Sequence, residues 1–156
     1  MEEILIQDIN TLKTKENTSV LLIWSEGCSV CTEVKPLFKN MSKKFDNMNF
    51  LTLQLNSDLV YDFYSKFVEA EDVKQLSLDS DGDPILDANG QPISSYVRDD
   101  EGNILRKAPL SVPRYFVFNK ESITDTSEWG FLGKVDGHND ELLDHILTTL
   151  DKGSIE

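Results

Sequence analysis

The sequence is poor in cysteine, with only Cys28 and Cys31 among its 156 residues. A chain of this length needs no disulfide to fold, because it can bury roughly two thirds of the surface that its unfolded form exposes. We therefore expect one domain over residues 1–156, built around one hydrophobic core.

Long hydrophobic runs are also missing. The longest apolar run spans about five residues, whereas a membrane-spanning helix needs about 20. The first ten residues, MEEILIQDIN, carry two acidic side chains where a signal peptide would carry basic ones. We therefore expect no membrane span, no signal peptide and a cytoplasmic location, where thiols are mostly kept reduced.

Basic residues are scarce. The chain has 15 Lys and Arg against 28 Asp and Glu, for a formal net charge of −13. Nucleic acids repel such a chain, so we expect no binding to DNA or RNA. The charge favours solubility and a basic partner, although a merely soluble acidic protein is the simpler interpretation.

The hydrophobic pattern alternates between strands and helices. Apolar residues at helical spacing predict a helix over 30–45 with Pro36 inside it, where proline kinks a helix. The predicted strands are 3–6, 19–24, 50–55, 114–118 and 128–135, and the other predicted helices begin at Asp8, within 56–58 and at Asn139. This order predicts an α/β fold with a central mixed β-sheet flanked by helices.

Residues 69–107 interrupt this alternation and read as an insertion. Residues 69–104 hold ten acidic and two basic residues, a net charge of −8. Turn signals at Gly82, Gly90 and Gly102 predict a small antiparallel β-ribbon with turns near 81–82, 88–90 and 99–102. A disordered acidic loop is the alternative.

A calcium site in this insertion is a weaker interpretation. An EF-hand loop that begins at Asp79 would need glycine at its sixth position and glutamate at its twelfth. The sequence has Pro84 and Gly90 there, so the pattern fails.

The two cysteines form a Cys-x-x-Cys motif between a predicted strand and a predicted helix. A helix N-terminus has free amide groups and a partial positive charge, which stabilise a thiolate at Cys28. Cys31 lies about one helical turn further on and can reach the sulfur of Cys28. This is the geometry that dithiol–disulfide exchange requires.

Two other interpretations of the cysteines were weighed. Structural zinc needs four ligands, of which one Cys-x-x-Cys supplies two. The histidines, His138 and His145, are seven residues apart, which is longer than the usual gap between paired ligands. An inert pair is possible, but chance rarely places the only two cysteines at this spacing.

With these features the sequence resembles the thioredoxin family. Trp24 lies four residues before Cys28, and Pro36 five residues after Cys31, as in the family. Val112-Pro113, directly before the strand at 114–118, resembles the family's cis-proline, which faces the dithiol. The likeness covers roughly residues 1–68 and 108–151.

The resemblance implies a thioredoxin fold and a thiol–disulfide oxidoreductase without a cofactor or metal. Cys28 would attack a protein disulfide and Cys31 would resolve the mixed disulfide. The implied substrate-binding residues are Trp24, Gly27, Ser29, Val30, Val112 and Pro113. The implied partners are protein disulfides and a thioredoxin-reductase-like electron donor, together with a basic partner at the insertion.

Three positions depart from the family pattern. Gly27 replaces the usual tryptophan, Ser29-Val30 replaces Gly-Pro, and Leu22 replaces a buried aspartate that assists proton transfer to the second cysteine. Two other functions therefore stay open. One is a non-catalytic binding module with the same fold, and the other is a relative that forms or isomerises disulfides.

Overall fold

The computed structural model describes residues 1–137 and 139–151. The chain forms two compact units, Met1–Phe67 with Ser111–Glu156, and Val68–Leu110. We call them the main unit and the inserted unit. The inserted unit covers the predicted insertion with slightly wider bounds, and one domain over residues 1–156 stays a prediction.

The main unit contains a five-stranded mixed sheet in the order β1-β3-β2-β8-β9. β1, β3 and β2 are parallel, while β8 is antiparallel to both β2 and β9. The strands are β1 (Glu2–Ile4), β2 (Thr18–Trp24), β3 (Asn49–Gln54), β8 (Arg114–Asn119) and β9 (Phe131–Asp136). β2 is buried along nearly its whole length, as expected for a strand covered on both faces.

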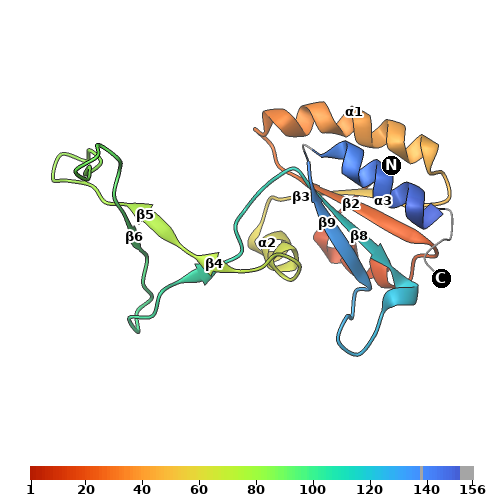
Figure 1. Ribbon diagram of the computed structural model, residues 1–156. Helices are drawn as coiled ribbons and strands as arrows, with labels where there is room; N and C mark the ends of the chain where they lie inside the picture. Colours follow the sequence, from red (N-terminus) through yellow and green to blue (C-terminus); the bar gives the residue numbers. More distant parts are fainter. Residues whose placement is uncertain (138, 152–156) are drawn as a thin grey trace. The chain divides into compact units, whose positions relative to one another are not determined.

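Helices cover both faces of this sheet. α1 (Ser29–Lys44) and α3 (Asp140–Asp151) lie on one face, and α2 (Asp58–Ser65) lies on the other (Figure 1). Two short 3-10 helices, η1 (Ile6–Lys13) and η2 (Lys120–Ser122), complete the unit. The predicted α/β architecture is therefore confirmed.

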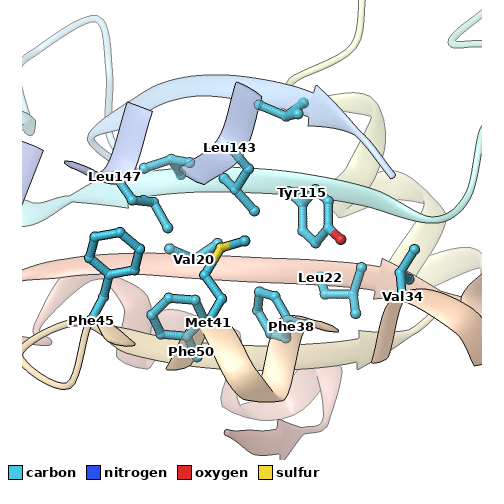
Figure 2. Close-up of a cluster of buried hydrophobic side chains, with 12 residues drawn as sticks. Val20, Leu22, Val34, Phe38, Met41, Phe45, Phe50, Tyr115, Leu143 and Leu147 are labelled. Carbon is cyan, nitrogen blue, oxygen red and sulfur yellow. The ribbon is translucent and has the colours of Figure 1, made fainter. Parts of the chain in front are cut away.

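The hydrophobic core fills the space between the sheet and the α1–α3 layer (Figure 2). Leu22 of β2 and Tyr115 of β8 pair across the sheet, and both side chains belong to this core. Phe38 of α1 stacks on Tyr115 with ring centroids 5.6 Å apart. Burial of such side chains is the main stabilising contribution to the fold.

Aromatic rings fill the opposite face of the sheet, beneath α2. Phe63 and Phe67 lie close to Phe118 of β8, with ring centroids 6.3 and 5.2 Å away. Trp129 and Phe131 extend the same cluster, at 5.1 Å from Phe63 and 4.8 Å from Phe67 respectively. The predicted apolar stripe of α2 is thus used for packing.

Two predicted boundaries are wrong. The first strand ends at Ile4, because the chain enters η1 at Ile6, and Asp8 lies inside η1 and is not its cap. The last strand begins at Phe131 and not at Glu128, because the backbone turns at Gly130, whose φ is +67°. That conformation is available to glycine at little cost.

The predicted helix caps are confirmed at two positions. Ser57 accepts a hydrogen bond from the Val60 amide at 3.4 Å, and Asn139 accepts one from the Leu142 amide at 3.3 Å. α1 runs through Pro36 without ending. No helix in residues 1–137 and 139–151 is both long and apolar enough to cross a membrane.

The inserted unit is an antiparallel ribbon, as predicted. β4 (Glu71–Asp72) pairs with β7 (Arg106–Lys107), and β5 (Lys74–Leu76) pairs with β6 (Ser94–Tyr96). The three turns fall where the glycines predict them.

The three turns share one construction. Oδ1 of Asp79, Asp87 and Asp99 accepts hydrogen bonds from the amides two and four residues later. The glycine three residues after each aspartate has a φ between +78° and +85°. Aspartate is favoured in such turns because its short side chain satisfies nearby backbone amides.

Backbone hydrogen bonds also join three chain segments into closed rings, which the sequence did not predict. In one ring, Ser77 donates to Ile93, Ile93 to Ile85 and Ile85 back to Ser77, at 2.9 Å each. A second ring joins Val73, Leu105 and Val97 in the same manner, at 2.8 to 2.9 Å.

Candidate active site

The two cysteines lie where β2 gives way to α1. A disulfide joins Cys28 to Cys31, with their Cα atoms 5.2 Å apart. The structure therefore describes the oxidised form of the pair.

Cys28 caps the N-terminus of α1. Its backbone is extended, and its sulfur accepts a hydrogen bond from the Cys31 amide at 3.2 Å. The first turn of the helix contains no acidic residue. In the reduced protein, this amide and the helix dipole would favour the thiolate of Cys28.

The two sulfurs differ in their access to solvent. Cys31 is 1% exposed, whereas Cys28 is only half-buried. Cys28 is therefore the more accessible residue of the pair, and the order of attack stays a prediction.

The loop before β8 lies against the dithiol. The Val112-Pro113 peptide bond is cis, as predicted. Sγ of Cys28 lies 3.8 Å from the carbonyl oxygen of Val112. A disulfide sulfur has no proton to donate, so this contact becomes a hydrogen bond only when Cys28 is a thiol. The Val112-Pro113 peptide group therefore lies next to Cys28, as predicted.

A small pocket of about 210 Å³ opens beside the disulfide. Of the predicted site residues, Trp24, Gly27, Cys28 and Cys31 line it. Ser29 and Val30 do not: Ser29 is exposed, and Val30 packs against the core. The other lining residues are Ser25, Glu26, Thr32 and Lys35.

Lys35 and Trp24 form one wall of this pocket. The ammonium of Lys35 lies 3.0 Å from the centroid of the Trp24 ring, which is a cation–π contact. The indole nitrogen of Trp24 is buried and has no hydrogen-bond partner among the described residues. Sequence reasoning missed Lys35, although one turn of helix separates it from Cys31.

Leu22 is fully buried, at the position where the family resemblance would place an aspartate. Its cross-strand neighbour is Tyr115. Burial, followed by the negative charge of Asp140, raises the pKa of Tyr115 to about 12. This hydroxyl therefore keeps its proton at neutral pH and cannot act as a base.

Three further residues surround the Val112-Pro113 loop, and sequence reasoning gave none of them a role in the site. Tyr64 accepts hydrogen bonds from the Ser111 amide and from Arg114. The Gly137 amide donates to the Pro113 carbonyl at 2.9 Å. A possible signal was Arg114 itself, a charged residue at the start of a core strand.

No group of three or more His, Cys, Asp or Glu side chains that could hold a metal ion occurs in residues 1–137 and 139–151. His138, one of the two histidines weighed as zinc ligands, lies outside the described residues.

No family model matches the chain, and no curated protein matches it significantly. Solved structures do. Thioredoxin f2 of Chlamydomonas reinhardtii superposes with a TM-score of 0.57 at 8% identity, covering 96% of this chain and 94% of its own. Thioredoxin of Fasciola hepatica gives 0.57 at 11% identity, covering 95% and 97%.

The chain has the thioredoxin fold. A third match, reduced thioredoxin pre-protein of Schistosoma mansoni, gives a TM-score of 0.57 at 13% identity over 95% of each chain. In this fold Cys28 of the present chain is the N-cap of α1, four residues after the end of β2, and Cys31 lies in the first turn of the helix. The fold and the pair together fit a thiol–disulfide oxidoreductase in general.

Proposed function

We propose that the chain is a thiol–disulfide oxidoreductase that reduces protein disulfides through Cys28 and Cys31. The observation that carries the proposal is the placement of Cys28. Its sulfur caps α1, accepts the Cys31 amide at 3.2 Å, is partly open to solvent and lies 3.8 Å from the Val112 carbonyl.

The reaction has two exchange steps. The Cys28 thiolate attacks one sulfur of the substrate disulfide, whose other sulfur leaves as a thiolate and takes up a proton. Cys31 then loses its proton and attacks Cys28, which releases the second substrate sulfur. Two electrons pass to the substrate, and the Cys28–Cys31 disulfide is the product. A reductase that supplies dithiol electrons would restore the reduced form.

The surroundings of the dithiol suggest how a substrate chain would bind. The proposed binding residues are Trp24, Gly27, Ser29, Val30, Val112 and Pro113. An extended substrate segment would pair with the backbone of Val112 as a short added strand. Ser29 and Val30 have the weakest support, since neither lines the pocket beside the disulfide.

The experiment that tests the proposal is trapping of mixed disulfides. Cys31→Ser should accumulate a mixed disulfide through Cys28, because the resolving thiol is missing. Cys28→Ser should accumulate little, because Cys31 is almost fully buried. Equal trapping by both variants would refute the assignment, and no loss of function in Cys28→Ser would favour a binding module. A redox titration of the pair separates a reductant from a disulfide-forming relative.

We also propose that the inserted unit recognises a basic partner. The unit holds ten acidic and four basic residues, a net charge of −6 over 43 residues. Large apolar side chains stand 39–55% exposed among them, namely Leu76, Leu78, Ile85, Leu86, Ile93 and Tyr96. A second copy of the unit would be repelled, so a cationic surface with apolar pockets is the better complement. The cytoplasmic location remains a prediction.

A further inference from the structure

We propose that Tyr64 is a positioning residue for the exchange reaction, holding the Val112-Pro113 loop in place against Cys28. The inference rests on the proposed function and adds a specific device to it. Tyr64 is fully buried and comes from α2, far from the cysteines in sequence.

The hydroxyl of Tyr64 joins both sides of the loop. It accepts a hydrogen bond from the Ser111 amide at 3.1 Å and another from Nη1 of Arg114 at 2.9 Å. Ser111 and Arg114 directly flank Val112 and Pro113 in the chain. One oxygen atom therefore fixes the two ends of the segment whose carbonyl faces Cys28.

Arg114 is itself held from a second side. Its Nε and Nη2 donate to Oδ1 of Asp136 at 3.2 and 3.0 Å, and the two residues are paired in the β8–β9 ladder. The side chain of Arg114 is 11% exposed, so its charge depends on these acceptors. Because its guanidinium is planar and rigid, fixing one edge also fixes the edge that meets Tyr64.

The hydroxyl oxygen of Tyr64 also links the chain segment that precedes the inserted unit to the segment that follows it. Tyr64 lies four residues before Val68, the first residue of that unit, and Ser111 is the first residue after it. The 43 residues of the inserted unit cannot fix the loop through the chain alone, so the hydrogen bond from Ser111 to Tyr64 sets where the returning chain enters the loop.

Loss of the Tyr64 hydroxyl should slow the reaction with a protein substrate more than the reaction with a small disulfide. Pairing with the Val112 backbone requires that the loop be ordered before the substrate arrives. A small disulfide needs only the sulfur of Cys28, which is held by α1 and the Cys31 amide. The two substrate classes therefore separate positioning from thiol chemistry.

The test compares Tyr64→Phe with Ser65→Ala, which removes from the same helix a hydroxyl that donates to the carbonyl of Asp62. The full-length reduced proteins are mixed with insulin or with hydroxyethyl disulfide. Tyr64→Phe should lower the second-order rate constant for insulin about tenfold, since two donors lose their acceptor. The rate with hydroxyethyl disulfide and the reduction potential of the pair should stay within about twofold of wild type. Ser65→Ala should leave both rates near wild type.

Arg114→Met provides a second variant in case the first fails to fold. It should slow insulin reduction but not the reaction with hydroxyethyl disulfide. The double variant should be no slower than Tyr64→Phe alone, because Arg114 acts on the loop through the Tyr64 hydroxyl. Equal loss with both substrates, or no loss with insulin, would overturn the role of Tyr64. If the wild-type protein reduces neither substrate, the proposed oxidoreductase function fails instead.

Discussion

At the scale of single residues, the buried neighbours Leu22 and Tyr115 carry no charge at neutral pH. Leu22 supplies no acid, and the hydroxyl beside it belongs to Tyr115, whose pKa is raised to about 12. The phenolate form is therefore disfavoured in the folded protein, mainly because the ring is buried.

This burial predicts a loss of stability at alkaline pH. The folded-state pKa of Tyr115 lies above the usual tyrosine value of 10.0, so its contribution to stability is complete below pH 10 and is lost as the pH rises toward 12. By pH 11 the loss should reach about 1.4 kcal/mol. Urea unfolding at pH 8 and pH 11 should show this loss in the wild type but not in Tyr115→Phe. Removing the hydroxyl of the exposed Tyr96 should not abolish it.

The sequence indicated the cysteine pair proposed to react, but not the residues that hold its surroundings. Cys28, Cys31 and Pro113 stand out because their types and spacing are rare. Tyr64 looked like one more member of an apolar stripe, and only the structure shows its hydroxyl meeting Ser111 and Arg114. A hydrogen bond between residues about 50 positions apart leaves no local pattern in a sequence.

At the scale of secondary-structure elements, the end of β9 lies close to the Val112-Pro113 loop, which leads into β8. A Cβ atom added at Gly137, just after β9, would clash with the ring and the carbonyl oxygen of Pro113. Gly133, within β9, has nothing within 4 Å of the corresponding position. The end of the strand thus tolerates no side chain, although its middle does.

These two glycines make a matched pair of variants. Gly137→Ala should destabilise the protein by about 1–3 kcal/mol, since the loop must shift to make room. It should also slow the reduction of insulin. Gly133→Ala should change stability by less than about 1 kcal/mol. Equal unfolding free energies for the two variants would contradict the proposed close packing.

Periodicity placed most elements correctly, since α1, α2, α3, β2, β3 and β8 begin within one or two residues of the predicted positions. The errors lie at η1 and β9. A 3-10 helix lacks the 3.6-residue period that identifies an α-helix, and β9 starts after a backbone turn that the apolar run from Trp129 conceals.

At the scale of the whole molecule, negative charge is denser in the inserted unit, which has a net charge of −6 over 43 residues against −7 over 113 residues in the main unit. Four acidic side chains of the inserted unit, Asp81, Asp83, Asp100 and Glu101, make no hydrogen bond that holds a turn. They can be neutralised without disturbing Asp79, Asp87 and Asp99, whose carboxylates do hold the turns.

Replacing these four acids by their amides should slow the reduction of a lysine-rich disulfide peptide at low salt, because attraction raises the association rate. The difference from wild type should vanish near 1 M salt, where screening acts within about 3 Å. Neutralising four exposed acids of the main unit, Glu2, Glu3, Asp46 and Asp125, is the control for net charge. The idea is wrong if both sets of substitutions slow the peptide equally, or if neither does.

The apolar pattern and the glycines of the insertion predicted its order and its turns, but not its rings of three segments. Each ring needs three chain segments, whose residues are 8 to 32 positions apart, to meet in one register. The alternation of apolar and polar residues along a strand does not predict hydrogen bonding among three segments.

The closed rings have a consequence for how the ribbon behaves in a crowded solution. At the six residues of the two rings, every amide and every carbonyl is already paired within the unit. An open strand edge would offer a template on which other chains could add, and this is the usual route to β-aggregation. Despite its exposed leucines and isoleucines, the ribbon offers no such template at these positions. It can be contacted there only through its side chains.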